Sequence, residues 1–404
     1  MVGRQVTRMI TRYHMLCICL SVVTCFCIPM IFMYDLELHH FLRMIPHDAG
    51  SEDVTTTGKM SSNGDNTTIH SNTVNAREVL DYKTNVLGIR KTGQVGYMVY
   101  DCSNAHHGEC GGWSDRLSGM LSVYVIALVT NQTFLVHHDN PCPLQDYLDY
   151  KGHNWVFNQA RMEAKQLSHQ YLPFYCKVPV AIRSNRLDRL FVTFHKEINF
   201  VRMNWDYTEH FRASKGIGKT VPWITTLQYS DIYKHFFNSL FVLKKELNDN
   251  LDSIKRQKQF ACAHIRMGES GTVRTTLPQL VDIWRFLKQK ERQKFSIFVA
   301  TDSNSVRKKA NKLFPRSIVD IDGIITHIDI TKKGDLCAGF RKAMLDFFML
   351  TRCEALLITR SGFGILAAYL REQHKLHCLT PNGVVSCTRF TIHDIYPTPI
   401  LSPF

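Results

Sequence analysis

Short apolar strands alternate with helical stretches through the last third of the chain, and this alternation is the feature that most constrains the fold. The predicted strands are 260–266, 295–300, 317–321 and 355–359. The predicted helices are 278–292, 305–313, 340–351 and 364–371. This order is typical of a doubly wound α/β sheet. Ligands bind such sheets beyond the carboxyl ends of the strands, so we expect functional residues there.

The N-terminal half repeats the pattern once. A strand at 95–100 precedes a glycine-rich loop, Cys110-Gly-Gly-Trp-Ser-Asp-Arg116, and a helix at 117–129 leads to a strand at 133–138. Residues 150–220 show no clear pattern. The sequence therefore predicts two α/β lobes, of which only the second is outlined in full.

A segment without Asp, Glu, Lys or Arg runs from His14 to Tyr34. Its 21 residues are enough for a helix to cross a bilayer. Arginines precede the segment and acids follow it, which predicts a cytosolic N-terminus and a single-pass type II orientation. The alternative is a cleaved signal peptide, but no Ala-x-Ala-like site follows the segment. Either interpretation puts the bulk of the chain in a lumenal or extracellular space.

Composition between residues 48 and 76 is dominated by Ser, Thr, Asn, Asp and Gly, which predicts a flexible stem. Five parts are therefore expected. They are a cytosolic tail at 1–13, a transmembrane anchor at 14–34, a stem at 35–92, an N-terminal lobe at 93–250 and a C-terminal lobe at 251–404, and the resemblance described below implies an acceptor side for the first lobe and nucleotide-sugar binding for the second. Asn66 and Asn131 each begin an N-glycosylation motif, in agreement with that compartment.

The net charge of +14, from 49 Lys and Arg against 35 Asp and Glu, suggests an anionic partner. A lumenal protein does not meet nuclear DNA or cytosolic RNA, so we expect no nucleic-acid partner. Anionic membranes and phosphate-bearing small molecules remain as candidate partners for the positive charge.

Nine cysteines lie outside the predicted anchor, an odd number that leaves one thiol without a partner inside the chain. Cys102–Cys110 and Cys378–Cys387 are plausible local disulfides. A zinc site remains open as an alternative. Its ligands would come from Cys102, His106, His107, Cys110, His137, His138 and Cys142, although no Cys-x-x-Cys or His-x₃-His spacing supports it.

Three strand ends carry candidate binding residues. His264 and Arg266 end the strand at 260–266, and a guanidinium there can clamp two diphosphate oxygens. Asp302 follows the next strand. Its carboxylate could contact a sugar hydroxyl or a base, or it could be the N-cap of the following helix. Ser361 and the amides of Gly362 and Phe363 begin a helix able to hold phosphate, or Ser361 is an ordinary cap. Together they indicate a nucleotide-diphosphate pocket.

These residues resemble the fucosyltransferase superfamily with GT-B-like lobes, which includes α1,6-fucosyltransferases, protein O-fucosyltransferases and nodulation fucosyltransferases. Ala263-His264-Ile265-Arg266 is similar to its His-x-Arg motif, and Phe298-Val-Ala-Thr-Asp302 is similar to its Ala-Thr-Asp strand. The stretch from Phe340 to Phe363 is similar without gaps to the last motif of the α1,6 enzymes. The loop at 110–116 is similar to the first-strand loop of the wider group.

The resemblance implies a two-lobed GT-B-like fold with a Rossmann-like C-terminal donor lobe, and a Golgi membrane enzyme with a lumenal catalytic domain. The reaction it implies is inverting transfer of fucose from GDP-fucose to a glycan or glycoprotein hydroxyl, without metal or cofactor. Arg266 would hold the β-phosphate. The implied donor-binding residues are His264, Arg266, Asp302, Arg341, Asp346, Ser361, Gly362 and Phe363. Gly111, Gly112 and Trp113 would face them from the other lobe.

Two departures bear on the catalytic base. Met267 replaces the second basic residue of the α1,6 enzymes, and Arg274 falls near the position of their Glu base. Glu269 is the nearest carboxylate and is our candidate base beside Arg266. Arg341 and Asp346 are five residues apart on one predicted helix, so only one of them is expected to face the site.

Three other functions remain open. Asp320-Ile321-Asp322 fits the Asp-x-Asp clamp of a metal-dependent glycosyltransferase. A Golgi sulfotransferase is also anchored by an N-terminal helix, but Arg360-Ser-Gly-Phe-Gly364 comes too late in the chain for its phosphate loop. A non-catalytic glycan-binding membrane protein would not need His264 and Arg266 together.

Overall fold

The computed structural model describes residues 96–103, 110–172, 190, 193–256, 258–268, 274–326, 328 and 334–396. The predicted anchor and stem lie outside these residues, as do Asn66, Cys176 and Glu269. No helix in the described part of the chain is both long and apolar enough to cross a bilayer.

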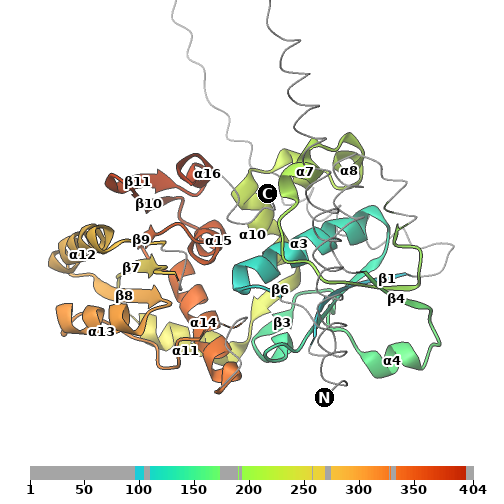
Figure 1. Cartoon of the computed structure of the whole chain (residues 1–404), viewed down its shortest axis with the longest axis horizontal. Helices are drawn as coiled ribbons and strands as arrows, with labels where there is room; N and C mark the ends of the chain where they lie inside the picture. The colour runs from blue at the N-terminus through green and yellow to red at the C-terminus, as the bar shows by residue number, and fades with distance from the viewer. Residues whose placement is uncertain are drawn as a thin grey trace, which may run out of the picture. The chain divides into compact units, whose positions relative to one another are not determined.

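The C-terminal lobe is a five-stranded sheet in the order β11-β10-β9-β7-β8 (Figure 1). Its strands are β7 (Phe260–Ile265), β8 (Ser296–Thr301), β9 (Ala355–Ile358), β10 (Lys375–Thr380) and β11 (Gly383–Thr388). The first four run parallel, and β11 returns antiparallel to β10 as a hairpin. The predicted α/β sheet is confirmed. The hairpin was not predicted, and the predicted strand at 317–321 is reduced to a single bridge between Ile297 and Ile318.

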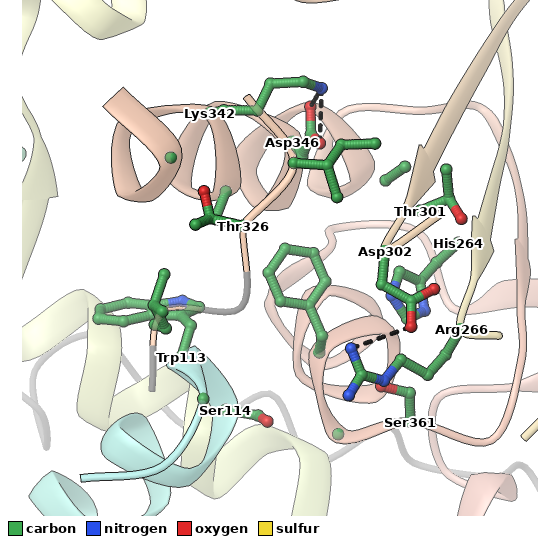
Figure 2. A pocket seen from close by; sticks show the side chains of 18 of the residues that line it. Trp113, Ser114, His264, Arg266, Thr301, Asp302, Thr326, Lys342, Asp346 and Ser361 are labelled. Atoms are coloured by element: carbon green, nitrogen blue, oxygen red, sulfur yellow. Dashed lines mark hydrogen bonds and ion pairs between the residues drawn. The ribbon is translucent and has the colours of Figure 1, made fainter. Parts of the chain in front are cut away.

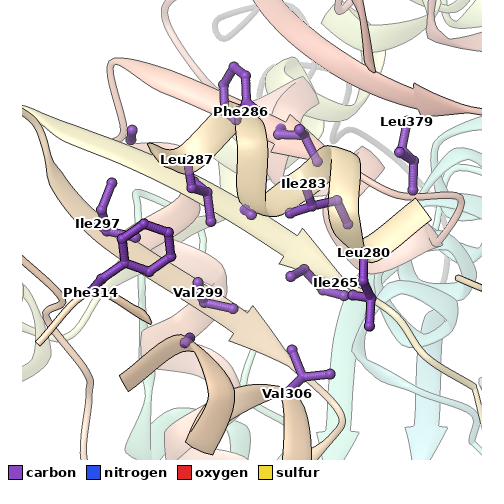
Figure 3. Close-up of a cluster of buried hydrophobic side chains, with 14 of the residues drawn as sticks. Ile265, Leu280, Ile283, Phe286, Leu287, Ile297, Val299, Val306, Phe314 and Leu379 are labelled. Atoms are coloured by element: carbon purple, nitrogen blue, oxygen red, sulfur yellow. The ribbon is translucent and has the colours of Figure 1, made fainter. Parts of the chain in front are cut away.

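The helices of this lobe are α12 (Leu277–Arg292), α13 (Asn304–Leu313), α14 (Leu336–Thr351) and α15 (Gly362–Leu370). Alternating residues of β7 separate the two faces of the sheet. Ala261, Ala263 and Ile265 pack in an apolar core with α12 and α13 (Figure 3). His264 points to the other face, toward α15, where its ring contacts Phe363. The core thus fixes which side chains of β7 are left for the site.

The N-terminal lobe is a four-stranded parallel sheet in the order β2-β1-β5-β4. Its strands are β1 (Tyr97–Cys102), β2 (Thr133–His138), β4 (His169–Leu172) and β5 (Ile198–Val201), and α3 (Trp113–Val129) crosses from β1 to β2. A two-stranded ribbon joins β3 (Leu148–Tyr150) to β6 (Phe241–Leu243). The other helices of this lobe and of the connection to the next, among the described residues, are η1 (Leu144–Asp146), α4 (Gln159–Glu163), α7 (Thr208–Ala213), α8 (Lys215–Thr220), α9 (Trp223–Thr226), α10 (Tyr229–Leu240) and α11 (Lys245–Lys255). A short helix, α16 (Ile392–Ile395), follows the β10–β11 hairpin of the C-terminal lobe.

Four disulfides join described cysteines: Cys102–Cys110, Cys142–Cys337, Cys262–Cys353 and Cys378–Cys387. Both local pairs suggested by the sequence are confirmed. The zinc alternative is wrong, because all three of its cysteines are oxidised in pairs. Cys142–Cys337 is of a different kind, since it ties the loop after β2 to the start of α14 across a sequence separation of 195.

The two lobes also pack around one aromatic ring on α14. The Phe340 ring centroid lies 6.0 Å from that of Trp113, 5.7 Å from that of His138 and 4.9 Å from that of Tyr147. Phe340 is fully buried by these contacts. Aromatic packing and the Cys142–Cys337 disulfide therefore hold α14 against the N-terminal lobe.

Loss of the inter-lobe disulfide is expected to cost more stability than loss of the local one. Chain entropy assigns about 5.3 kcal/mol to a loop as long as that closed by Cys142–Cys337, and about 2.6 kcal/mol to the short loop of Cys378–Cys387. Replacing each pair by alanines should therefore lower the free energy of unfolding by amounts that differ by roughly 2.7 kcal/mol. Equilibrium denaturation measures the free energy of unfolding of both variants. Equal losses would contradict the larger stabilisation expected from the Cys142–Cys337 disulfide.

Candidate functional site

A cavity of about 250 Å³ lies at the carboxyl ends of β7 and β8 (Figure 2). It is also lined by α14, the first turn of α15, Arg274, residues 324–326 and 328, and the first turn of α3. The structure brings seven of the predicted donor-binding residues to this cavity: His264, Arg266, Asp302, Asp346, Ser361, Gly362 and Phe363. Gly112 and Trp113 line it from the N-terminal lobe.

Arg266 and Asp302 form an ion pair, with Nη1 3.1 Å from Oδ2. Asp302 also accepts from the backbone amides of Met267 and Gly268, at 2.8 and 3.0 Å. It is not the cap of α13, because Ser303 accepts from the amide of Val306 in that role. The carboxylate therefore serves the site: it fixes the loop after β7 and the arginine together.

The backbone of Arg266 is held on both sides. Its amide donates to Thr359 Oγ1 at 3.0 Å, and its carbonyl accepts from Thr275 Oγ1 at 2.7 Å. Both threonines are fully buried, whereas the arginine side chain keeps 27% of its surface exposed. A planar guanidinium held in this way is a preorganised partner for two phosphate oxygens.

His264 is a buried neutral imidazole beside this arginine. Burial lowers its pKa to about 4, and nearby Arg266 adds to that effect while Asp302 opposes it. The ring stacks on Phe363, with centroids 5.2 Å apart, and Nδ1 has no hydrogen-bond partner among the described residues. Gly364 makes room for the ring, since a Cβ there would lie 2.6 Å from Nδ1. His264 is thus suited to a hydrogen bond with a ligand, not to charge.

The N-terminus of α15 opens into the same cavity. Ser361 occupies the N-cap position, but its side chain makes no capping hydrogen bond. The amides at the start of this helix and the Ser361 hydroxyl are therefore both available to an anion. The interpretation of Ser361 as an ordinary side-chain cap is not supported.

Arg341 and Asp346, the two charged residues predicted on α14, face different sides of the helix, as their spacing suggested. Asp346 lines the cavity. Arg341 does not: its Nη2 lies 3.2 Å from Glu246 Oε1, and its side chain is 42% exposed. Five residues of α-helix turn the two side chains to different faces. The donor-binding role expected for Arg341 is therefore not supported by its position.

Lys342 is the site residue that the sequence analysis missed. Its Nζ lies 2.5 and 2.7 Å from the two carboxylate oxygens of Asp346, and both side chains are buried. Burial raises the pKa of Asp346 to about 6, and Lys342 holds it below the value that burial alone would set. The signal available in the sequence was a lysine four residues before the aspartate in an otherwise apolar helix.

Asp320 is engaged by a neighbour that an Asp-x-Asp metal clamp would have to displace. Arg307 Nε lies 2.5 Å from its Oδ2, and Lys342 Nζ lies 3.9 Å from its Oδ1. Among the residues that the structure describes, no group of three or more His, Cys, Asp or Glu side chains is placed to hold a metal ion. The metal-clamp alternative therefore has no structural support at Asp320.

The first turn of α3 closes the cavity from the N-terminal lobe. Asp115 Oδ2 accepts from the amide of Gly112 at 2.8 Å. Gly111, at a φ of 76°, makes the turn into this helix, and a Cβ there would lie 2.6 Å from Asp115 Cβ. Gly111 shapes the loop without lining the cavity. Asn131 is exposed in the turn between α3 and β2.

No family model matches the chain, and no curated protein matches its sequence. Its structure is similar to several solved ones. A mutant of Arabidopsis thaliana FUT1 in complex with GDP is 14% identical over 75% of each chain, with a TM-score of 0.49. NodZ α1,6-fucosyltransferase soaked with GDP-fucose is 13% identical over 74% of this chain and 99% of that one, with a TM-score of 0.44. POFUT1 in complex with GDP is 11% identical over 70% of this chain and 96% of that one, with a TM-score of 0.38.

NodZ is a fucosyltransferase, as are the proteins whose motifs the sequence resembles. At 11–14% identity the likeness shows the fold alone.

Substitution of Gly364 by alanine is expected to push the His264 ring off Phe363. Overpacking of this kind costs about 1–3 kcal/mol of stability. The double variant Gly364→Ala, His264→Ala should recover part of that loss, because the methyl group then occupies space that the ring has left. Thermal unfolding of both single variants and the double variant measures this, and strictly additive losses would contradict the contact.

Proposed function

We propose that the protein is a Golgi-type glycosyltransferase that moves fucose from GDP-fucose to a glycan or glycoprotein hydroxyl, with inversion and without a metal ion. The observation that carries the proposal is the arrangement around Arg266. A guanidinium fixed by Asp302, a neutral imidazole and a helix N-terminus meet in one cavity, with a buried carboxylate on its α14 wall. A sugar nucleotide has the phosphate, sugar and base that these groups suit.

Cleavage of the bond between fucose and phosphate builds positive charge on the sugar and negative charge on the departing GDP. Arg266 and the N-terminus of α15 lie where they can stabilise the departing diphosphate. Many glycosyltransferases use a divalent cation for this task. Because Asp302 already orients the guanidinium, little reorganisation is needed when the charge develops.

An inverting transfer also needs a base for the acceptor hydroxyl. We keep Glu269 as one candidate. A carboxylate of the N-terminal lobe is the other, and Asp115 is such a residue lining the cavity. His264 does not suit this role, since its pKa of about 4 makes it a very weak base.

The compartment is part of the proposal. We infer a type II anchor at 14–34 in the Golgi membrane, a stem at 35–92 and a lumenal catalytic unit. Four disulfides support it, because such bonds persist in oxidising compartments. The exposed position of Asn131 is compatible with N-glycosylation there.

Arg266→Ala is expected to reduce release of GDP from GDP-fucose by about 10²–10³-fold, the usual loss when one preorganised donor to a developing charge is removed. Arg266→Lys should recover little, because an ammonium cannot reproduce the two-pronged contact. Arg285→Ala is the control, since that exposed arginine pairs with Asp282 on α12. Turnover and GDP affinity of the full chain are the measurements. Wild-type turnover in Arg266→Ala would contradict the assignment of Arg266 as the residue that stabilises the departing diphosphate.

Chelation by EDTA is expected to leave turnover unchanged, because Arg266 and the α15 amides supply the charge stabilisation. The same assay is repeated after dialysis and with added Mg²⁺ or Mn²⁺. A loss of activity in EDTA that either ion restores would contradict the metal-independent mechanism. It would instead support a metal site at Asp320.

A further inference from the structure

Half of the net positive charge of the chain is concentrated in one short stretch. Residues 277–316 contain ten Lys and Arg against three Asp and Glu, a net +7 out of the +14 of the whole sequence. This stretch runs from the start of α12 through β8 and α13 to the turn that follows α13. Such a concentration creates a strong local field wherever the cations share one side of the fold.

The two helices of this stretch lie side by side on one face of the C-terminal sheet. Side chains of α12 and α13 share the apolar core on β7 and β8 (Figure 3). Trp284 of α12 packs on Phe314, the C-cap residue of α13, with ring centroids 6.3 Å apart. Lys288 Nζ lies 5.4 Å from the centroid of the same ring. Packed helices are about 8–10 Å apart, so the outward side chains of these two form one surface.

Helical periodicity turns the cations of both helices away from the shared core. Arg285 and Arg292 are two turns apart on one side of α12, and Lys308 and Lys312 are one turn apart on α13. All four side chains are exposed. Two further exposed lysines complete what we call the basic face, which consists of Arg285, Lys288, Arg292, Lys308, Lys309 and Lys312.

Only part of this charge is neutralised within the protein. Asp282 Oδ1 lies 2.7 Å from Arg285 Nη1, and Glu291 Oε2 lies 2.7 Å from Lys288 Nζ. Among the residues that the structure describes, no carboxylate forms an ion pair with the other four cations of the face. The basic face therefore keeps an excess of positive charge that is open to solvent.

Helix geometry does not account for all of these cations. The helix dipole favours a cation in the last turn of a helix, which explains Arg292 and Lys312. Lys308 and Lys309 lie in the middle of α13, outside the reach of that effect. Lys308 and Lys312 are also four residues apart, a spacing at which like charges on a helix repel each other. A bound polyanion would remove this repulsion.

The composition of the basic face favours one class of polyanion. Protein interfaces centre on aromatic residues and are depleted of lysine, whereas four of the six residues here are lysines. The negative surface potential of membranes belongs to the cytoplasmic leaflet, and the compartment proposed above is lumenal. That compartment also holds no nuclear DNA or cytosolic RNA. Surfaces rich in lysine and arginine bind heparin-like polysaccharides as well as nucleic acids.

We propose that the basic face of α12 and α13 binds an anionic glycan, a chain of sugars that carry sulfate or carboxylate groups. The choice of a glycan rests on the lumenal compartment of the proposed function, but the binding does not require fucose transfer. Ser303 caps α13 directly after Asp302 of the cavity. A rise of 1.5 Å per residue places Lys309 and Lys312 roughly 9 and 14 Å further along the axis, so this site is separate from the cavity.

The first test measures binding of the full chain to three polysaccharides by calorimetry, over a series of NaCl concentrations. Heparin should bind, completely desulfated heparin should bind more weakly through its carboxylates, and neutral dextran should not bind. The logarithm of the heparin Kd should rise linearly with the logarithm of the salt concentration, because bound cations displace counterions. Equal binding of heparin and dextran, or heparin binding that salt leaves unchanged, would overturn the proposal.

A triple variant locates the site. Lys308→Gln, Lys309→Gln, Lys312→Gln should weaken heparin binding by about 10- to 100-fold at low salt. The salt dependence should also become shallower, because fewer counterions are displaced. All three side chains are exposed, so the variant should unfold at the wild-type temperature and bind GDP as the wild type does.

The matched control removes the same charge from the N-terminal lobe. Lys151→Gln, Lys165→Gln, Lys219→Gln changes three lysines that are also exposed but lie outside the basic face. This variant should bind heparin within about 2-fold of the wild type, because salt screens distant exposed charges. Equal losses in the two triple variants would show that heparin responds only to net charge, and would overturn the basic face as a site.

Removal of an acid gives a test that does not depend on a loss. Asp282→Asn releases the guanidinium of Arg285 from its ion pair on α12. This variant should bind heparin about 2- to 5-fold more tightly than the wild type. Unchanged or weaker binding would contradict the extension of the basic face onto α12.

The outcomes separate this inference from the proposed function. A wild-type chain that binds GDP but not heparin at physiological salt contradicts only the basic face. A chain that binds heparin but not GDP contradicts only the proposed function. Phosphatidylserine vesicles test the membrane: vesicle binding that the Lys308, Lys309, Lys312 variant loses, while its heparin binding stays at the wild-type level, would overturn the choice of a glycan.

Discussion

The ion pair between Arg266 and Asp302 is the interaction on which the site depends. One carboxylate contacts the guanidinium and the amides of the two residues that follow it. The ends of β7 and β8 are thereby joined beyond the last paired residues of the sheet, and the arginine side chain cannot turn away without breaking its ion pair with Asp302. The fold supplies the position, since parallel strands bring their carboxyl ends to one edge.

Much of this could be predicted from the chain itself. Strand-end residues such as His264, Arg266 and Asp302 are close in space in any doubly wound sheet, so local patterns were enough to gather them. Strands β4 and β5 were missed because each is only four residues long, and β5 pairs with β1, which is distant in sequence. The β10–β11 hairpin escaped prediction too, although its cysteine pair was suggested.

Side-chain partners were harder to predict than backbone positions. A helical spacing of five separates Arg341 from Asp346, but it does not say which of them faces the cavity. Packing of Phe340 against the N-terminal lobe decides this, and that contact joins residues far apart in the chain. Lys342 was recognised as a site residue only from the structure, in which its ammonium contacts both oxygens of Asp346.

The Cys142–Cys337 disulfide limits how the two lobes can move relative to each other. It fastens the N-terminal lobe to the start of α14, next to the aromatic contacts of Phe340. Two bodies joined covalently at one point can rock about that point but cannot separate there. Relative movement of the two lobes is therefore confined to rotation about this junction, and the lobes can open only on the side away from the bond.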